Sequence, residues 1–319
     1  MFDAADLLKA WTPFPLLSST IPSTGTIHQT RLLKTARGDY ALRIYRYIDR
    51  WPIECEHALI AYARKQTIPA VAPLPLPSGE TILERDGRFY SLFPIAVGYQ
   101  VPRGELTTEQ AAAMGSFLSE VHHALRNYPQ SRVPQRTLTV DPTNTMLKLD
   151  RIEAVIRSRP KLDEMDQHLL ERLKLKRNQL STSPSVDANN LSTLEHQVIH
   201  GDYQETNLFF ENDGVSAIID WDQAYTAPRA WEVVRTLHLA LKFDADLCRA
   251  FLDAYREGLP LPIADLELAA ACYAQKRVHD LWMYEAIYLE GNDRVRTFLQ
   301  PGTNSLSVAE RWITLRDSL

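Results

Sequence analysis

Acidic and amide side chains gather in one part of the sequence, between residues 198 and 222. His200, Gly201 and Asp202 follow two apolar residues, and Asn207 comes five positions after Asp202. This spacing is typical of a loop that catalyses phosphoryl transfer, in which the Asp accepts the proton of a substrate hydroxyl and the Asn binds magnesium. The sequence therefore predicts a catalytic loop at this place.

A second acidic site follows a short apolar segment a few residues later. Asp220, Trp221 and Asp222 come directly after Ala217, Ile218 and Ile219, and thirteen positions separate Asn207 from Asp220, which is enough for a short β-hairpin. Magnesium prefers hard oxygen ligands, and acids at strand ends are held firmly enough to supply them. We expect Asp220 to be the second metal ligand.

Together the two motifs resemble those of the aminoglycoside phosphotransferase and choline kinase family, the small-molecule branch of the protein-kinase-like fold. The matching residues are His200, Gly201, Asp202, Asn207, Asp220, Trp221 and Asp222. The resemblance implies ATP and Mg²⁺ as cofactors, Asp202 as catalytic base, and Asn207 and Asp220 as metal ligands, while His200 buttresses the loop. The alternative is that these acids only cap turns.

The first ninety residues contain the elements that such a site needs for a nucleotide. Their patterns predict a hairpin from 27–35 and 40–47, a helix over 53–66, and a second hairpin from 81–84 and 88–93. In the second strand of the first hairpin, Arg43 stands where the family usually has a lysine that binds nucleotide phosphates. Its expected ion-pair partner is Glu56 in the helix, with Glu54 as a second candidate and a solvated helix charge as the alternative interpretation.

Two further stretches are expected to contact the nucleotide. Thr24, Gly25 and Thr26 precede the first strand, where the resemblance places a phosphate-covering loop, although a plain β-turn fits the same residues. Backbone groups near Phe93 and Ile95, at the end of the second hairpin, are expected to contact adenine. The boundary between the two lobes is expected directly after them.

The rest of the chain is mostly helical in pattern, with helices expected from Thr107, over 144–158 and 161–180, and again from about Ala230; the tract 181–193 is expected to be a flexible connection. The resemblance implies that Glu232 anchors the catalytic loop. For the acceptor we expect Asp222 and a helix face that carries Trp282, Glu285 and Tyr288 at helical spacing. The alternative for this aromatic stripe is core packing.

The composition agrees with a globular protein of two lobes. The chain has 319 residues, 45% of them hydrophobic and 24% charged, with a net charge of −5 and no dense basic run, which argues against a nucleic-acid partner. No signal sequence or membrane-spanning run is recognisable, so a cytoplasmic protein is expected. Together with these patterns, the resemblance implies an α+β, bilobal protein-kinase-like fold with a strand-rich lobe over 1–97 and a helical lobe over 98–319.

The resulting hypothesis is an ATP- and Mg²⁺-dependent phosphotransferase that acts on a hydroxyl of a small molecule, such as an amino alcohol, a sugar or an antibiotic. Two alternatives stay open. One is a protein Ser/Thr kinase of the stress-response type, which needs an open groove for a protein substrate. The other is a nucleotide-binding pseudokinase without catalytic activity, which the replacement of the usual lysine by Arg43 favours.

Overall fold

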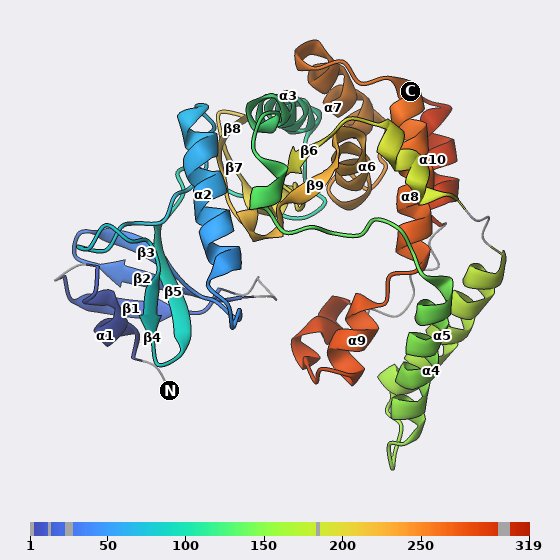
Figure 1. Ribbon diagram of the computed structural model, residues 1–319, viewed down its shortest axis with the longest axis horizontal. Helices are drawn as coiled ribbons and strands as arrows, with labels where there is room; N and C mark the ends of the chain where they lie inside the picture. Colours follow the sequence, from blue (N-terminus) through green and yellow to red (C-terminus); the bar gives the residue numbers. More distant parts are fainter. Residues whose placement is uncertain (1–2, 12–13, 23–27, 183–185, 299–306) are drawn as a thin grey trace. The chain divides into compact units, whose positions relative to one another are not determined.

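The structure is a computed structural model that describes residues 3–11, 14–22, 28–182, 186–298 and 307–319 (Figure 1). The chain forms two compact units. Unit 1 comprises residues 1–136 and 196–261, and unit 2 comprises residues 137–195 and 262–319. The expected lobe boundary after residue 97 lies inside unit 1 and stays a prediction.

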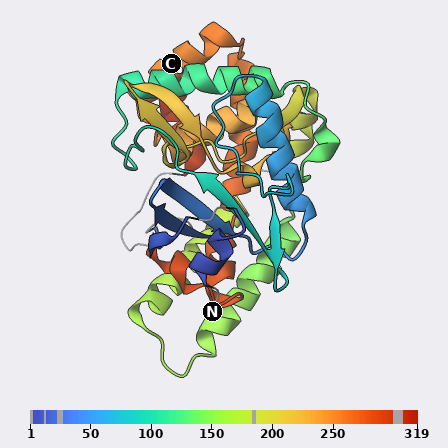
Figure 2. The ribbon, with the colours of Figure 1, turned by 90° about the vertical axis from the view of Figure 1, so that its left-hand side faces the viewer.

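The N-terminal part of unit 1 is a five-stranded antiparallel sheet in the order β1-β2-β3-β5-β4 (Figure 2). Its strands are β1 (Leu16–Thr20), β2 (Gln29–Thr35), β3 (Gly38–Ile44), β4 (Leu83–Arg85) and β5 (Arg88–Pro94). The two hairpins expected from the sequence, β2–β3 and β4–β5, are therefore confirmed, and the sequence missed the mostly polar strand β1.

Side chains alternate between the two faces of this sheet, and each face has its own apolar cluster. Leu42 and Ile44 of β3 pack with Leu7 and Leu8 of the short helix α1 (Ala4–Leu8). Helix α2 (Trp51–Lys65), which contributes Ile53 to a cluster with Tyr45 and Phe89, confirms the helix expected over 53–66. Arg43 lies between Leu42 and Ile44 in sequence and so points to the opposite face of β3.

The remainder of unit 1 combines two small sheets with three helices. The strands β6 (His196–Ile199) and β9 (Tyr225–Pro228) form one antiparallel pair, and β7 (Leu208–Glu211) and β8 (Gly214–Ile218) form a hairpin. The helices are α3 (Thr108–Leu125), α6 (Arg229–Leu239) and α7 (Ala245–Gly258). A capping box between Thr107 and Gln110 begins α3, as the sequence predicted.

Helices α3 and α7 pack against each other at unusually short range. A Cβ atom at Gly115 of α3 would collide with the backbone of Phe251 of α7, and one at Gly258 of α7 would collide with the Ser119 side chain of α3. His122 of α3 also accepts a hydrogen bond from Tyr255 of α7 through Nδ1, at 2.8 Å. Glycine at these two positions is therefore required for the contact.

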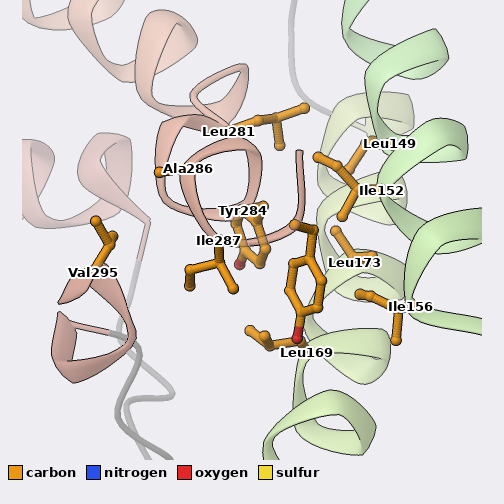
Figure 3. Close-up of a cluster of buried hydrophobic side chains, with 11 residues drawn as sticks. Leu149, Ile152, Ile156, Leu169, Leu173, Leu281, Tyr284, Ala286, Ile287 and Val295 are labelled. Atoms are coloured by element: carbon orange, nitrogen blue, oxygen red, sulfur yellow. The ribbon is translucent and has the colours of Figure 1, made fainter. Parts of the chain in front are cut away.

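Unit 2 has a core of its own. Its helices are α4 (Pro142–Arg157), α5 (Glu164–Thr182), α8 (Ile263–Val278), α9 (Trp282–Tyr288) and α10 (Val308–Arg316). Figure 3 shows Leu149, Ile152 and Ile156 of α4 and Leu169 and Leu173 of α5 pointing toward α9, and these side chains are all buried. Helices expected over 144–158 and 161–180 are confirmed.

The tract 181–193, which the sequence predicts as a flexible connection, is partly ordered into helix. Residues Ala188–Thr193 form a 3₁₀ helix that Asp187 caps, and Leu191 in it is buried. The prediction was wrong there because a single buried apolar side chain fixes a polar segment that shows no periodic pattern. In the described ranges, no helix is both long and apolar enough to cross a lipid bilayer.

Candidate active site

The loop between β6 and β7 carries the first of the two acidic motifs. β6 ends before His200, and Gly201 has a φ of 81°, a left-handed conformation that favours glycine. A Cβ atom at Gly201 would also collide with the carbonyl oxygen of Gln223. The loop ends in a 3₁₀ helix, Glu205–Asn207, from which β7 continues. Glycine at position 201 thus lets the chain turn sharply between His200 and Asp202.

The backbone of this loop is held by Glu232 of α6. One carboxylate oxygen of Glu232 accepts a hydrogen bond from the amide of Gly201, and the other accepts from the amide of His200, at 3.1 Å, and from Nε2 of His122, at 2.9 Å. Burial alone would raise the pKa of Glu232, but the hydrogen bond from His122 and the nearby His200 leave that pKa below its usual range. An ionised Glu232 therefore anchors the loop at its start.

His200 ties the loop to the strand end that carries the second motif. It is fully buried; its Nδ1 accepts from the amide of Asp202, at 3.3 Å, and its Nε2 therefore donates to the carbonyl oxygen of Ile219, at 3.0 Å. The amide of Ile219 in turn donates to the carbonyl oxygen of Asn207, at 3.0 Å. These contacts fix Asp202 and Asn207 relative to Asp220.

The carboxylate of Asp202 accepts three hydrogen bonds from side chains. Oδ1 accepts from Nη2 of Arg235, at 2.7 Å, while Oδ2 accepts from Nε2 of Gln204, at 2.8 Å, and from Nδ2 of Asn207, at 2.9 Å. Nδ2 of Asn207 also donates to the carbonyl oxygen of Asp202, at 2.8 Å. Both N–H bonds of the Asn207 amide are thereby used, which leaves its Oδ1 oxygen for a cation.

Asp220 stands at the turn between β8 and the 3₁₀ helix Trp221–Gln223, in a left-handed conformation with φ 69° and ψ 55°. Its Oδ1 accepts from Nη2 of Arg43, whose Nη1 donates to Oε1 of Glu56, at 2.6 Å. The structure thus brings Arg43, Glu56 and Asp220 together from β3, α2 and the end of β8. The side chains of Arg43 and Glu56 are largely buried, with 15% and 2% of their surface exposed.

These three groups, of which Glu56 is buried and Arg43 and Asp220 are partly buried, carry two carboxylates and one guanidinium. Burial raises the pKa of Glu56 to about 8, although the neighbouring Arg43 acts in the opposite direction. Burial also raises the pKa of Asp220, which Arg43 again opposes. An additional cation at this place would therefore favour the ionised forms of both carboxyl groups.

Asp222 lies near these groups and contacts the segment that precedes β2. It is buried, and its Oδ2 accepts from Nε2 of His28 and from Nε2 of Gln223, both at 3.0 Å. His28 in turn accepts from the amide of Arg46 through Nδ1, at 3.3 Å. Among the described residues, Oδ1 of Asp222 has no hydrogen-bond partner. The residue proposed for the acceptor thus ties the second motif to the segment before β2.

Of the residues expected around the nucleotide base and its phosphates, only some belong to the part of the chain that the structure describes. Phe93 lies in β5, with its ring 5.9 Å from the guanidinium carbon of Arg43, and Ile95 follows the strand with 42% of its surface exposed. Thr24, Gly25 and Thr26, expected to cover the phosphates, lie outside the described residues.

The helix face expected to bind the acceptor belongs to α9 of unit 2. Trp282 is 44% exposed, Glu285 forms an ion pair with Lys148 at 2.7 Å, and Tyr288 is buried and donates to Asp166 at 2.8 Å. Tyr288 also belongs to the apolar core of unit 2, so for this residue core packing, the alternative interpretation, accounts for its position. The acceptor role of the three stays a prediction.

Sequence reasoning missed three residues that contact the motif acids: Gln204, Arg235 and His28. A signal was present for Arg235, because it follows Glu232 by three positions and so lies on the same face of α6. Gln204 lies inside the motif, where its type alone does not reveal its contact. His28 pairs with a residue 194 positions away, which no local pattern shows.

The donor set fits a magnesium ion that is bound mainly through a nucleotide. Among the described residues, no three His, Cys, Asp or Glu side chains group as they would in a metal site made by the protein alone. One carboxylate, of Asp220, and one amide oxygen, of Asn207, remain. Magnesium usually keeps several waters and takes one or two protein oxygens together with substrate phosphates, which agrees with this pair.

Comparisons with known proteins show the family to which the chain belongs. The model of the phosphotransferase enzyme family, APH, matches residues 19–266. Homoserine kinase of Zymomonas mobilis subsp. mobilis is 23% identical over 253 residues, which are 77% of this chain and 73% of that protein. Homoserine kinase of Bradyrhizobium sp. strain ORS 278 is 26% identical over 274 residues, covering 83% and 78% of the two chains.

Solved structures of the same fold include two antibiotic kinases. Amicoumacin kinase hAmiN, in complex with AMP-PNP, Ca²⁺ and Ami, has a TM-score of 0.64 at 14% identity and covers 99% of this chain and 92% of its own. Spectinomycin phosphotransferase with ADP and spectinomycin has a TM-score of 0.63 at 15% identity, with 98% and 92% covered. They confirm the expected α+β, protein-kinase-like fold. With a family model that matches more than three quarters of its length, the chain belongs to the phosphotransferase enzyme family and is a small-molecule phosphotransferase.

Proposed function

We propose that the protein transfers the γ-phosphoryl group of ATP, with Mg²⁺, to a hydroxyl group of a small molecule. The observation that carries the proposal is an arrangement of five side chains in unit 1. Asn207 contacts Asp202, and Arg43 contacts both Asp220 and Glu56. A base, two oxygen ligands and a paired cation are the groups that phosphoryl transfer requires.

Contacts support the roles proposed for Asp202, Arg43 and His200, and the other roles in the nucleotide site rest on the family resemblance. Asp202 accepts the proton of the acceptor hydroxyl, since three donors hold its carboxylate in one orientation. Arg43, kept in place by Glu56, binds nucleotide phosphate oxygens, and the backbone near Phe93 and Ile95 contacts the adenine. His200 holds the loop, and Thr24, Gly25 and Thr26 cover the phosphates.

Magnesium, when bound, neutralises the charge that develops on the transferring phosphoryl group. The residues that would hold it are Asn207, through Oδ1, and Asp220. Arg43 donates to a carboxylate oxygen of Asp220 in the structure, so this guanidinium must share or release that oxygen when the cation arrives.

For the acceptor we propose an amino alcohol as the first class to test, with sugars and antibiotics next. The curated relatives are homoserine kinases and cover more than three quarters of this chain. Asp222, Trp282, Glu285 and Tyr288 are the residues proposed for acceptor binding. A carboxylate beside aromatic rings suits a substrate that carries an ammonium group.

The test is a transfer assay with purified protein, Mg²⁺ and ATP over amino alcohols including homoserine, sugars and aminoglycosides. We expect a phosphorylated product for one class, and Asp202→Asn should lower kcat about 10²- to 10⁴-fold while Mg²⁺–nucleotide binding persists. Asp253→Asn, an exposed acid on α7, is the matched control and should leave kcat unchanged.

Other outcomes would contradict the proposal in distinct ways. Transfer to a general protein substrate alone would indicate a protein kinase. Nucleotide binding without transfer to any acceptor would indicate a pseudokinase. An Asp202→Asn variant with full activity would show that another group is the base.

A further inference from the structure

We infer that Arg235 is a positioning residue for Asp202 and that Oδ1 of Asp202, the oxygen beside Arg235, is the atom that receives the acceptor's proton. The inference rests on the proposed function, which makes Asp202 the base. It adds a residue outside both sequence motifs and assigns different roles to the two oxygens of one carboxylate.

The hydrogen bonds around Asp202 distinguish its two oxygens. An ionised carboxylate offers about four lone-pair sites, two on each oxygen. Oδ2 accepts from Gln204, at 2.8 Å, and from Asn207, at 2.9 Å, so both of its sites are used. Oδ1 accepts from Arg235 alone among these donors, at 2.7 Å, which leaves one site on Oδ1.

The donors on Oδ2 are themselves held in place. Oε1 of Gln204 accepts from Nη2 of Arg103, at 3.1 Å, so the amide is oriented with its N–H toward Asp202. Asn207 donates to both the side chain and the backbone of Asp202. Rotation of the carboxylate out of its present plane would break these contacts as well as the one to Arg235.

Helix α6 places Arg235 where this contact can form. Glu232 binds the backbone of the loop at His200 and Gly201, and Arg235, three residues later on the same helix face, binds the side chain of Asp202. One helix thus fixes both the start of the loop and its base. The ion pair is partly buried, with 23% of Arg235 and 17% of Asp202 exposed, so water screens it less than a surface pair.

This geometry favours transfer of the acceptor's proton to Asp202 as the phosphoryl group moves. The acceptor oxygen forms its bond to the γ-phosphorus while the bond from that phosphorus to the oxygen of the leaving ADP breaks. The hydroxyl proton of the acceptor passes to Oδ1 of Asp202, from which water later removes it. Arg235 takes no proton, because its guanidinium stays charged, and it acts only by holding the carboxylate.

The experiment compares Arg235→Met and Arg235→Lys in the transfer assay with the acceptor found for the wild type. We expect Arg235→Met to lower kcat about tenfold to a hundredfold, because small misplacements of a catalytic group have effects of this size. The KM for ATP should change less than about threefold, since Arg235 contacts the base and not the groups proposed for nucleotide binding. The kcat of Arg235→Lys should lie between those of the wild type and Arg235→Met, because lysine keeps the charge but lacks the planar guanidinium.

A double-mutant cycle separates positioning from a general structural role. If Arg235 acts through Asp202, Arg235→Met should lower the residual kcat of Asp202→Asn by less than about twofold. The matched control is Arg249→Met, which removes an exposed ion pair with Asp246 on α7 and should leave kcat at the wild-type value. Thermal unfolding of each variant monitors the fold.

The results that would overturn the inference differ from those that would overturn the proposed function. Full kcat in Arg235→Met, or the same loss of kcat in the wild-type and Asp202→Asn backgrounds, would show that Arg235 does not position the base. A wild-type protein that phosphorylates none of the acceptors would instead remove the proposed function, and the inference with it.

Discussion

At the scale of single residues, Arg43 is shared between two carboxylates. Its guanidinium donates to Glu56 through Nη1 and to Asp220 through Nη2. A lysine at this position is one point charge with rotating donors and does not reproduce this planar bridge. The arginine is therefore suited to connect helix α2 with the end of β8.

Replacing Arg43 should therefore affect nucleotide binding in a graded way. We expect Arg43→Met to weaken Mg²⁺–nucleotide binding by about 1.5–3 kcal/mol, the usual contribution of a hydrogen bond to a charged group. Arg43→Lys should weaken this binding by a smaller amount. Isothermal titration calorimetry with a non-hydrolysable ATP analogue measures the change, and Arg88→Met, an exposed arginine on β5, is the control on the same sheet. Unchanged affinity in Arg43→Met would exclude the phosphate-binding role.

His57 predicts a pH dependence of stability. Burial lowers its pKa to about 3, with Arg43 and Arg50 acting in the same direction, whereas an unfolded histidine has a pKa of about 6.5. Between these values the unfolded state binds the extra proton, so folding stability decreases as the pH falls from 6.5 toward 3. The slope contributed by one proton is at most about 1.4 kcal/mol per pH unit.

The variant His57→Gln isolates this contribution. Glutamine can retain a hydrogen bond to Tyr45 or Thr81, which lie 3.1 and 2.7 Å from the ring nitrogens of His57, but it does not titrate. Urea unfolding at several pH values should show a shallower loss of stability below pH 6.5 for the variant. Identical pH profiles for the two proteins would mean that His57 is not buried in the neutral form.

The sequence predicted which acids meet and the pair of Arg43 with Glu56, but it missed Arg235 and His28, which hold Asp202 and Asp222. Asp202 and Asp220 follow β6 and β8, and Asn207 directly precedes β7, so local spacing was sufficient. Glu56 lies on the helix directly after the strand of Arg43, which also made their pairing predictable. The pairing of Arg235 with Asp202 depends on how α6 crosses the loop, which is set by packing rather than by spacing.

At the scale of elements, the start of α6 determines the shape of the catalytic loop. Glu232 accepts hydrogen bonds from two backbone amides of the loop and one from His122 of α3. A neutral glutamine at this position offers one acceptor oxygen to three donors. At least one buried N–H group would then lack a partner.

Glu232→Gln should therefore destabilise the protein. We expect a loss of about 2–4 kcal/mol in the free energy of unfolding, since breaking a buried charged network has an effect of this order. Chemical denaturation measures the loss, and Glu257→Gln, an exposed acid of α7, is the control. A change below 0.5 kcal/mol in Glu232→Gln, the range of ordinary surface substitutions, would contradict an anchoring role.

Helices, hairpins and the short apolar strands β6, β7 and β8 were predictable from their patterns, whereas β1 and β9 were not. β1 has mostly polar residues and lies at the edge of its sheet, where one face meets solvent. β9 has four residues and ends at Pro228, which also precedes the first turn of α6. Such segments become strands because a neighbouring strand supplies hydrogen bonds, which a sequence pattern does not reveal.

At the scale of the whole molecule, the residues proposed for nucleotide and acceptor divide between the two units. The groups proposed for the nucleotide and magnesium, Arg43, Glu56, Asn207 and Asp220, belong to unit 1. Of the residues proposed for the acceptor, Asp222 also belongs to unit 1, whereas Trp282, Glu285 and Tyr288 belong to unit 2. The sequence predicted two parts but not that each unit is built from separate segments. That division results from long-range packing, such as that of α3 on α7.

A substitution in the core of unit 2 should therefore separate the two kinds of binding. Leu173→Ala removes a buried side chain of α5 and should cost about 2–5 kcal/mol of stability. Hydrogen exchange should increase in α4, α5 and α9, and the KM for the acceptor should rise. Nucleotide affinity, measured by calorimetry, should stay at the wild-type value; a parallel loss of nucleotide affinity would place nucleotide-binding groups in unit 2.

The close packing of α3 on α7 also has a consequence for the order in which the chain acquires its structure during synthesis. The five-stranded sheet and α2 are contiguous in sequence and can pair as soon as they leave the ribosome. Helix α3 must wait for α7, which is translated more than a hundred residues later, and closing so long a loop is entropically costly. During that interval the apolar face of α3 around Gly115 is uncovered, so chaperone dependence and aggregation of the nascent chain should concentrate there.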